Sequence, residues 1–183
     1  MKPWKQALDD AALSGGLASA LSTLVLAWRG RRDAGSGAAP LNAPAHWLWS
    51  RALGQDRSSL RYTVLGMVVH HLSSVFWAFF YEKASPAQAR PDARQALRTA
   101  AAVTTLAAVV DLKLVPERLT PGFERRIDVS SLLLVYAAFA SGLALGSLLR
   151  GPRGAIVHRD TALAAQGHAS DAQAVARGGR RLP

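Results

Sequence analysis

The sequence of 183 residues has no cysteine. This absence excludes a disulfide scaffold, an iron–sulfur centre and a thiol nucleophile. Acidic residues are few, because 12 Asp and Glu stand against 22 Lys and Arg and leave a formal net charge of +10. The basic residues form neither a helix face nor a patch interleaved with aromatic side chains, so we expect no nucleic-acid partner. They flank apolar runs instead, where anionic lipid headgroups would meet them.

Three long runs lack any Asp, Glu, Lys or Arg, namely residues 11–28, 62–81 and 129–149. At about 1.5 Å per residue, helices of this length match the hydrocarbon core of a bilayer. We therefore predict a transmembrane helix in each run. The first run follows Lys2 and Lys5 as in a secretory signal, but no small-residue cleavage site precedes the basic stretch that ends it. We expect that helix to stay uncleaved.

A fourth run is shorter and less apolar. Only residues 99–110 are free of charge, and an extension to 96–115 includes Arg98, Asp111 and Lys113. The two basic side chains can reach opposite interfaces, whereas the aspartate is too short to do so. We predict that this segment crosses as well, with three crossings as the alternative. The predicted fold is an all-α integral membrane bundle of four transmembrane helices.

The rest of the chain connects or follows these helices. Residues 29–61 include the stretch LNAPAHWLWSRALG, which predicts a short interfacial segment between the first two helices, with its tryptophans at headgroup level. Residues 1–150 form one membrane domain in this interpretation. Residues 151–183 are rich in Ala, Gly and Arg without periodicity, which predicts a disordered basic tail. Lys and Arg are almost balanced between the two sides, so they do not predict an orientation.

Small residues recur at four-residue spacing in the first and the last predicted membrane helix. This spacing lets another helix approach closely. We therefore predict close packing between these helices, and the same faces would suit a homo-oligomer. The residues are Gly15 with Ser19, Gly16 with Ala20, and Ala138 with Gly142 and Gly146.

Two adjacent histidines, His70 and His71, lie at the centre of the run 62–81. An ionisable residue at mid-membrane is costly, which makes it a functional hypothesis. The simpler interpretation is that neutral imidazoles hydrogen-bond to hydroxyl groups of neighbouring helices. Adjacent helical positions point about 100° apart, so only one ring can face a given partner. The possible partners are Ser22, Thr23, Thr104, Thr105 and Tyr136.

A candidate polar site within the membrane combines His70, His71, His46 and Asp111, which are also the only candidate metal ligands. A ring at the midplane lies about 12 Å from the interface, so the segment that carries His46 would have to dip inward. No catalytic residue is predicted. No cofactor is predicted either, because a bis-histidine haem needs rings on two facing helices and a di-metal carboxylate site needs Glu-x-x-His pairs.

The stretches LNAPAHWLW, HHLSSVFWAFFYEK and DLKLVPERLTPGFERRI resemble those of small, uncharacterised proteobacterial inner-membrane proteins. The resemblance covers about residues 10–150 and implies a multi-pass protein of the bacterial inner membrane, without an activity. We predict an integral membrane protein without an enzymatic role, whose partner is the lipid bilayer. One alternative is a small oligomeric transporter or proton-coupled carrier that uses the mid-membrane histidines. The second is a membrane-embedded, metal-dependent enzyme.

Overall fold

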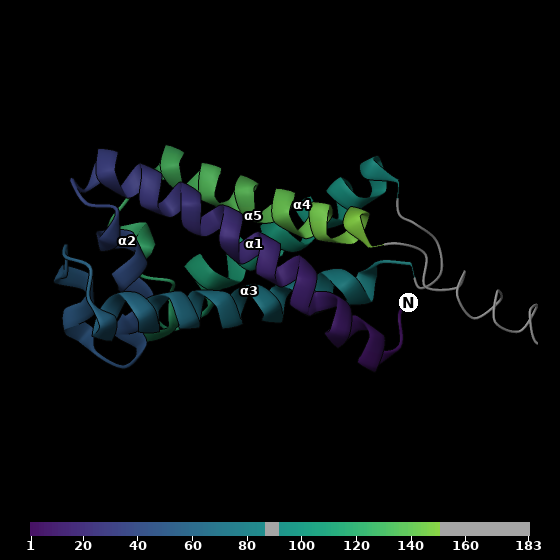
Figure 1. The fold of residues 1–183 in the computed structure, drawn as a ribbon, viewed down its shortest axis with the longest axis horizontal. Helices are drawn as coiled ribbons and strands as arrows, with labels where there is room; N and C mark the ends of the chain where they lie inside the picture. Colours follow the sequence, from purple (N-terminus) through teal and green to yellow (C-terminus); the bar gives the residue numbers. More distant parts are fainter. Residues whose placement is uncertain (87–91, 151–183) are drawn as a thin grey trace, which may run out of the picture. The chain divides into compact units, whose positions relative to one another are not determined.

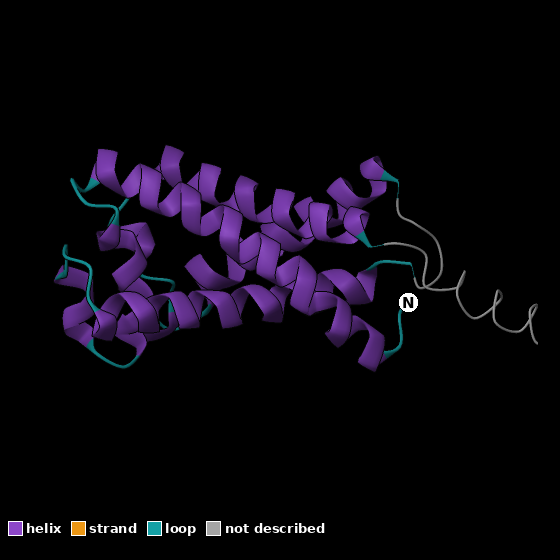
Figure 2. Ribbon diagram, viewed as in Figure 1, coloured by secondary structure: helices purple, strands orange, loops and turns teal. Residues whose placement is uncertain are grey.

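The part of the chain that the structure describes is built of helices and their connections. The computed structural model describes residues 1–86 and 92–150, which belong to one compact unit, Met1–Arg150. The tail predicted for residues 151–183 lies outside the described residues. Within the described ranges the secondary structure is helical, without a strand (Figure 2). The α-helices in Figure 1 are α1 (Trp4–Asp33), α2 (Ala38–Asn42), α3 (Leu65–Ala84), α4 (Ala93–Val109) and α5 (Val129–Leu149).

Three helical segments are long and apolar enough to cross a membrane, which makes the chain a candidate multi-pass membrane protein. They are Trp4–Asp33, Leu60–Ala84 and Val129–Leu149, and the second includes a π-turn, η3 (Leu60–Val64), before α3. Each contains one of the uncharged runs. α4 has 17 residues and falls short of the same length and composition. The described residues therefore contain three candidate spans rather than the four that we predicted.

The long helices α1 and α5 pack closely against each other. A Cβ atom placed on Gly142 would lie 2.4 Å from Cα of Ala18, and one placed on Gly146 would lie 2.4 Å from Cα of Ser14. Only the hydrogen of glycine fits at such distances, so the two backbones are in contact. The predicted close packing of these two helices is therefore confirmed.

The small residues of α1 serve two neighbours. Ser14 and Ala18 face α5, whereas Gly15 faces α3, where an added Cβ would lie 2.7 Å from Cα of Val75. Gly16 has nothing within 4 Å of that position, so no described residue packs against it there. α1 is thus the central helix, with α5 on one face and α3 on another (Figure 1).

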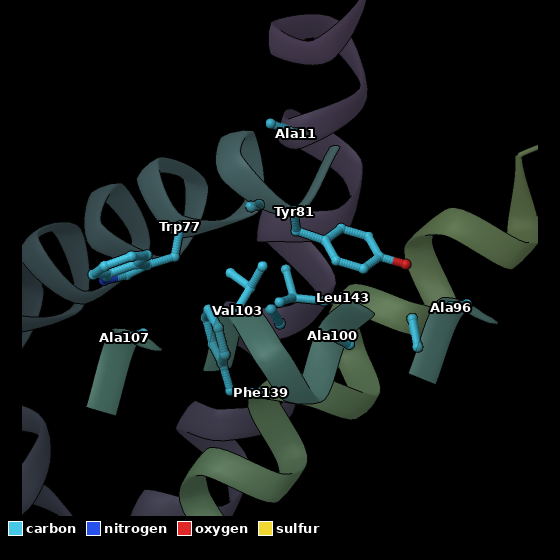
Figure 3. Packing of buried hydrophobic residues seen from close by; sticks show 12 residues of the cluster. Ala11, Trp77, Tyr81, Ala96, Ala100, Val103, Ala107, Phe139 and Leu143 are labelled. Atoms are coloured by element: carbon cyan, nitrogen blue, oxygen red, sulfur yellow. The ribbon is translucent and has the colours of Figure 1, made fainter. Parts of the chain in front are cut away.

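α4 packs mainly on α5. Its buried residues recur every three or four positions and form one face, which meets large side chains of α5 and α3 (Figure 3). Direct contacts between α4 and α3 are few. The buried cluster includes Ala96, Ala100, Val103, Ala107, Phe139, Leu143, Trp77 and Tyr81.

One end of the bundle is closed by a buried cluster of charged side chains. Lys2 Nζ lies 2.8 Å from Asp10 Oδ2 and also contacts Glu82. Arg150 donates to Glu82 Oε1 at 2.5 Å and lies 3.5 Å from Asp10. Glu82 is completely buried, and the two cations compensate its charge. This cluster joins the N-terminal segment to the last turn of α3 and the end of α5.

α1 ends, and α5 begins, at the opposite end of the bundle. Arg29 Nε donates to Ser131 Oγ at 2.6 Å, and Ser131 Oγ donates to Asp33. The backbone N–H of Asp128, at the start of α5, donates to Asp33 Oδ2 at 3.1 Å. α5 is therefore antiparallel to α1 and parallel to α3.

The connection between α1 and α3 is a folded cap, whereas we expected one short interfacial segment. After α2 it contains two 3₁₀ turns, η1 (Ala43–Trp47) and η2 (Ser50–Gly54). Asn42 is fully buried and donates to two backbone carbonyls of the cap, at 2.8 and 3.1 Å. The Trp47 indole N–H donates to the carbonyl of Thr120 at 2.9 Å. The cap thus packs on the connection between α4 and α5.

Candidate functional site

A cavity of about 480 Å³ lies between α3, the end of α4 and the connection to α5. This volume is within the usual range of small-molecule sites. Leu72 and Phe76 of α3 line it and are 63% and 56% exposed on the outside of the bundle. The wall of the cavity therefore reaches the outer surface of the bundle.

Two local features form the cavity. α4 ends at Val109 and continues as a π-turn, η4 (Val110–Leu114), in which the N–H of Val115 donates to the carbonyl of Val110 at 3.0 Å. A π-turn shifts the helical register and is frequent at functional sites. On the other side, α3 presents residues at helical spacing along one face. These are Val69, His70, Ser73, Ser74 and Trp77.

His70 lines the cavity and is held by α1. Its Nε2 lies 2.8 Å from Ser22 Oγ, one of the hydroxyl partners that we predicted. Ser22 also lies 2.7 Å from the carbonyl of Ala18 and donates its single proton there. The imidazole is then the donor to Ser22, so its proton is on Nε2. This assignment leaves Nδ1 as an acceptor, and no partner for it is present in residues 1–86 and 92–150.

Asp111 reaches the same cavity from η4. Trp77 of α3 lines the same cavity. In the described ranges no Lys or Arg forms an ion pair with Asp111. The carboxylate is therefore a partly buried acceptor without a counter-charge among the described residues.

Tyr136 of α5 supplies a further polar group to the cavity wall. Its hydroxyl oxygen is buried and makes no hydrogen bond to any described residue. A buried hydroxyl without a partner is costly, which makes this group available to a ligand. Asp111 and Tyr136 line the same cavity.

The remaining candidate residues lie elsewhere. His71 is exposed on the outer face of α3. His46 is buried in the cap, where Nδ1 lies 2.8 Å from the carbonyl of Ala43, and Gly122, with φ of +81°, packs against its ring. Of the four residues proposed from the sequence, the structure brings only His70 and Asp111 to one cavity. In the described part of the chain, no group of three or more His, Asp or Glu is placed to hold a metal ion.

Sequence reasoning did not assign Trp77 to the site and considered Tyr136 only as a hydrogen-bond partner. Trp77 lies seven positions after His70, which places both on one helical face. That spacing was a usable signal for Trp77. No local signal indicates that Tyr136 faces the same cavity, because it lies on another helix.

No family model, curated protein or solved structure matches this chain. The resemblance to proteobacterial inner-membrane proteins stays a prediction. The functional conclusions below therefore depend on the helix directions and on the cavity.

Proposed function

We propose that the chain is an integral membrane protein with four crossings, the fourth being α4 with η4. The contacts at the two ends of the bundle support this proposal. Glu82, at the end of α3, meets Lys2 and Arg150 at one end, whereas Ser131, near the start of α5, meets Arg29 at the other. The chain between α3 and α5 must therefore traverse the length of the bundle. If α1, α3 and α5 span the membrane, this segment has to cross as well.

The composition of α4 is compatible with a crossing in this arrangement. Its outward positions include Leu97, Leu106 and Val109, which are exposed to the surroundings of the bundle. Arg98 lies near its start, where a long side chain can reach the interface. Asp111 lines the cavity instead of facing lipid. A helix that hides its polar residues in this way needs less apolar character than an isolated span.

Single-cysteine labelling in intact membrane vesicles tests the crossing, and the absence of native cysteine removes any background. Four crossings require Ser58→Cys and Arg118→Cys to react from one side. Lys5→Cys and Ala93→Cys must then react from the other. Labelling of positions 58 and 118 from opposite sides would overturn the proposal.

The role that the cavity supports best is binding of a lipophilic small molecule that enters from the membrane. The single observation behind this is a cavity of about 480 Å³ whose exposed flanks, Leu72 and Phe76, lie on the outer surface of the bundle. A mostly apolar pocket with a few polar groups is the usual form of a ligand site.

A cavity-filling variant tests the binding role. Ser73→Phe places a ring in the cavity, and Ala101→Phe places the same ring on an exposed position of α4 outside it. We expect a lipophilic fluorophore, diphenylhexatriene, to accept energy from the tryptophans of the native chain and of the Ala101 variant. The Ser73 variant should lose this signal. Equal signals in both variants would contradict binding in the cavity.

A carrier is the second candidate. His70 and Asp111 share one cavity within the membrane region, and ionisable groups at such depth often mark proton or solute paths. Four helices enclose little volume, so a carrier would need a homo-oligomer, for which the open position Gly16 offers a small-residue face. Uptake of a ligand into proteoliposomes, driven by a pH gradient, would favour this candidate over simple binding.

We also propose the bacterial inner membrane as the location, with anionic headgroups around the basic ends of the helices. The resemblance noted from the sequence and the positions of Lys and Arg beside the apolar runs support this. Fractionation of bacterial envelopes that express the chain tests the location directly. Recovery in the soluble fraction would contradict it.

A further inference from the structure

We propose that the cavity takes a lipophilic cation, an organic amine or ammonium, with the Asp111 carboxylate as its counter-charge. This inference rests on the proposed binding function and names the chemical class of the ligand. It follows from the charges around the cavity, the aromatic groups in its wall and the acceptors that have no partner.

The charges around the cavity favour a positive ligand. The charged side chain that acts most on Asp111 is Glu124, which has the same sign. Glu124 Oε2 is buried without a hydrogen-bond partner among the described residues, and its other oxygen lies 3.8 Å from Arg125 Nε. Arg125 also pairs with Glu117 at 2.6 Å, and Arg126 is engaged by Asp56. The nearby arginines are thus directed to other carboxylates.

A buried carboxylate without a counter-charge is costly, and a cation brought by a ligand would relieve that cost. An anionic ligand, such as a fatty acid, would meet the Asp111 carboxylate instead. Like charges at short range oppose binding strongly in a medium of low dielectric constant. The cavity therefore selects against the anionic class and, more weakly, against neutral molecules.

The wall of the cavity is rich in aromatic rings. The π-face of such a ring is electron-rich and attracts ammonium groups, an interaction that grows when water is excluded. Rings come from the cap, from α3, from the connection after α4 and from α5, so they surround the cavity. They are Trp47, Phe76, Trp77, Phe123, Tyr136 and Phe139.

The unpartnered hydrogen-bonding groups match a donor headgroup. Asp111 offers carboxylate oxygens. His70 offers Nδ1 as an acceptor, because its Nε2–H donates to Ser22 Oγ. The Tyr136 oxygen can accept a further bond. A protonated amine presents up to three donors, whereas a carboxylate or phosphate headgroup presents mainly acceptors. The unpartnered acceptors therefore favour the same class of ligand as the negative charge of Asp111 and the aromatic wall.

A pair of probes that differ in one charged group tests this inference. Diphenylhexatriene is neutral, and its trimethylammonium derivative is the same fluorophore with a permanent positive charge. Energy transfer from the tryptophans reports binding to the full chain in a non-ionic detergent. Because the chain carries a net charge of +10, general electrostatic attraction cannot produce a preference for the cation.

We expect the cationic probe to bind the native chain about tenfold more tightly than the neutral probe, as one desolvated charge contact would provide. Asp111→Asn should remove this preference, and Asp111→Glu should retain most of it. Asp9→Asn, at an exposed position of α1, should leave it unchanged.

Equal affinity of the native chain for both probes would overturn the inference while leaving the binding function intact. This measurement needs no variant, so a failure of Asp111→Asn to fold does not affect it. A preference that survives in a folded Asp111→Asn protein would also overturn the role of Asp111. If neither probe receives energy from the native chain, the proposed binding function itself fails.

Discussion

The interface between α1 and α5 and the region between α3 and α4 are opposite solutions to helix packing. In the first, Gly142 and Gly146 bring two backbones into contact. In the second, large side chains and the π-turn η4 keep the helices apart and leave a cavity of about 480 Å³. Apolar helices in lipid gain little from hiding apolar surface, so side-chain size decides how closely they approach.

The two regions also treat polar groups differently. At the α1–α5 interface, Ser14 of α1 donates to the backbone carbonyl of Asp10 in its own helix, at 3.1 Å. In the cavity, the Tyr136 hydroxyl lacks a partner in the described part of the chain and Asp111 lacks a counter-charge there. The close interface is thus a structural element, whereas the open region retains binding capacity.

The largest effect on stability is expected at the buried charged cluster that closes one end of the bundle. Glu82→Gln would remove one of the two carboxylates, Glu82 and Asp10, that pair with Lys2 and Arg150, and should lower the free energy of unfolding by about 3–5 kcal/mol. Thermal unfolding in detergent would measure this loss. Glu117→Gln is the matched control, because that side chain is 81% exposed and its ion pair is worth about 0–1 kcal/mol. Identical melting of the Glu82 variant and the native chain would contradict the buried cluster.

A smaller loss is expected from one methyl group in the interface itself. Gly142→Ala places a Cβ where Ala18 Cα would lie 2.4 Å away, so the helices must separate, at a cost of about 1–3 kcal/mol. Gly16→Ala adds the same methyl group in open space and should change stability little, or raise it by up to about 1 kcal/mol through helix propensity. Paired unfolding curves compare the two. Equal stability of both variants would show that the backbones are not in contact.

The smallest effect concerns the histidines beside the cavity. His70→Leu removes the hydrogen bond to Ser22, and polar contacts between membrane helices are worth about 0.6 kcal/mol on average and up to about 1.7. His71→Leu removes an exposed ring that makes no hydrogen bond within the described ranges, and it should be neutral. The difference between the two melting temperatures is the measurement. A larger loss of thermal stability in His71→Leu than in His70→Leu would mean that His71, and not His70, faces the bundle.

Much of the helical architecture could be predicted from local composition. The run 129–149 has the same bounds as α5, and the runs 11–28 and 62–81 lie within longer helices. The predicted helices were too short because each run was ended at the first charged residue. Asp10 and Glu82 are such residues, and they lie inside the helices because they are paired within the protein. Pairing of this kind depends on other helices and leaves no trace in the run itself.

The candidate site was predictable only in part. His70 was chosen because an ionisable residue interrupts an apolar run, and such an interruption can be read directly. His46 was included on topology alone, yet its ring is satisfied within the cap by the carbonyl of Ala43. Tyr136 could not be assigned, because its position relative to His70 depends on how α5 lies against α3.

The sequence by itself determined which segments are apolar helices and where glycine permits close approach, since both depend on residues near one another in the chain. The tertiary structure decided the direction of α5, the folding of the cap and the meeting of His70, Asp111 and Tyr136 in one cavity. These features depend on distances between residues on different helices. Such distances are set by side-chain volume and by contacts at the helix ends, which no single segment encodes.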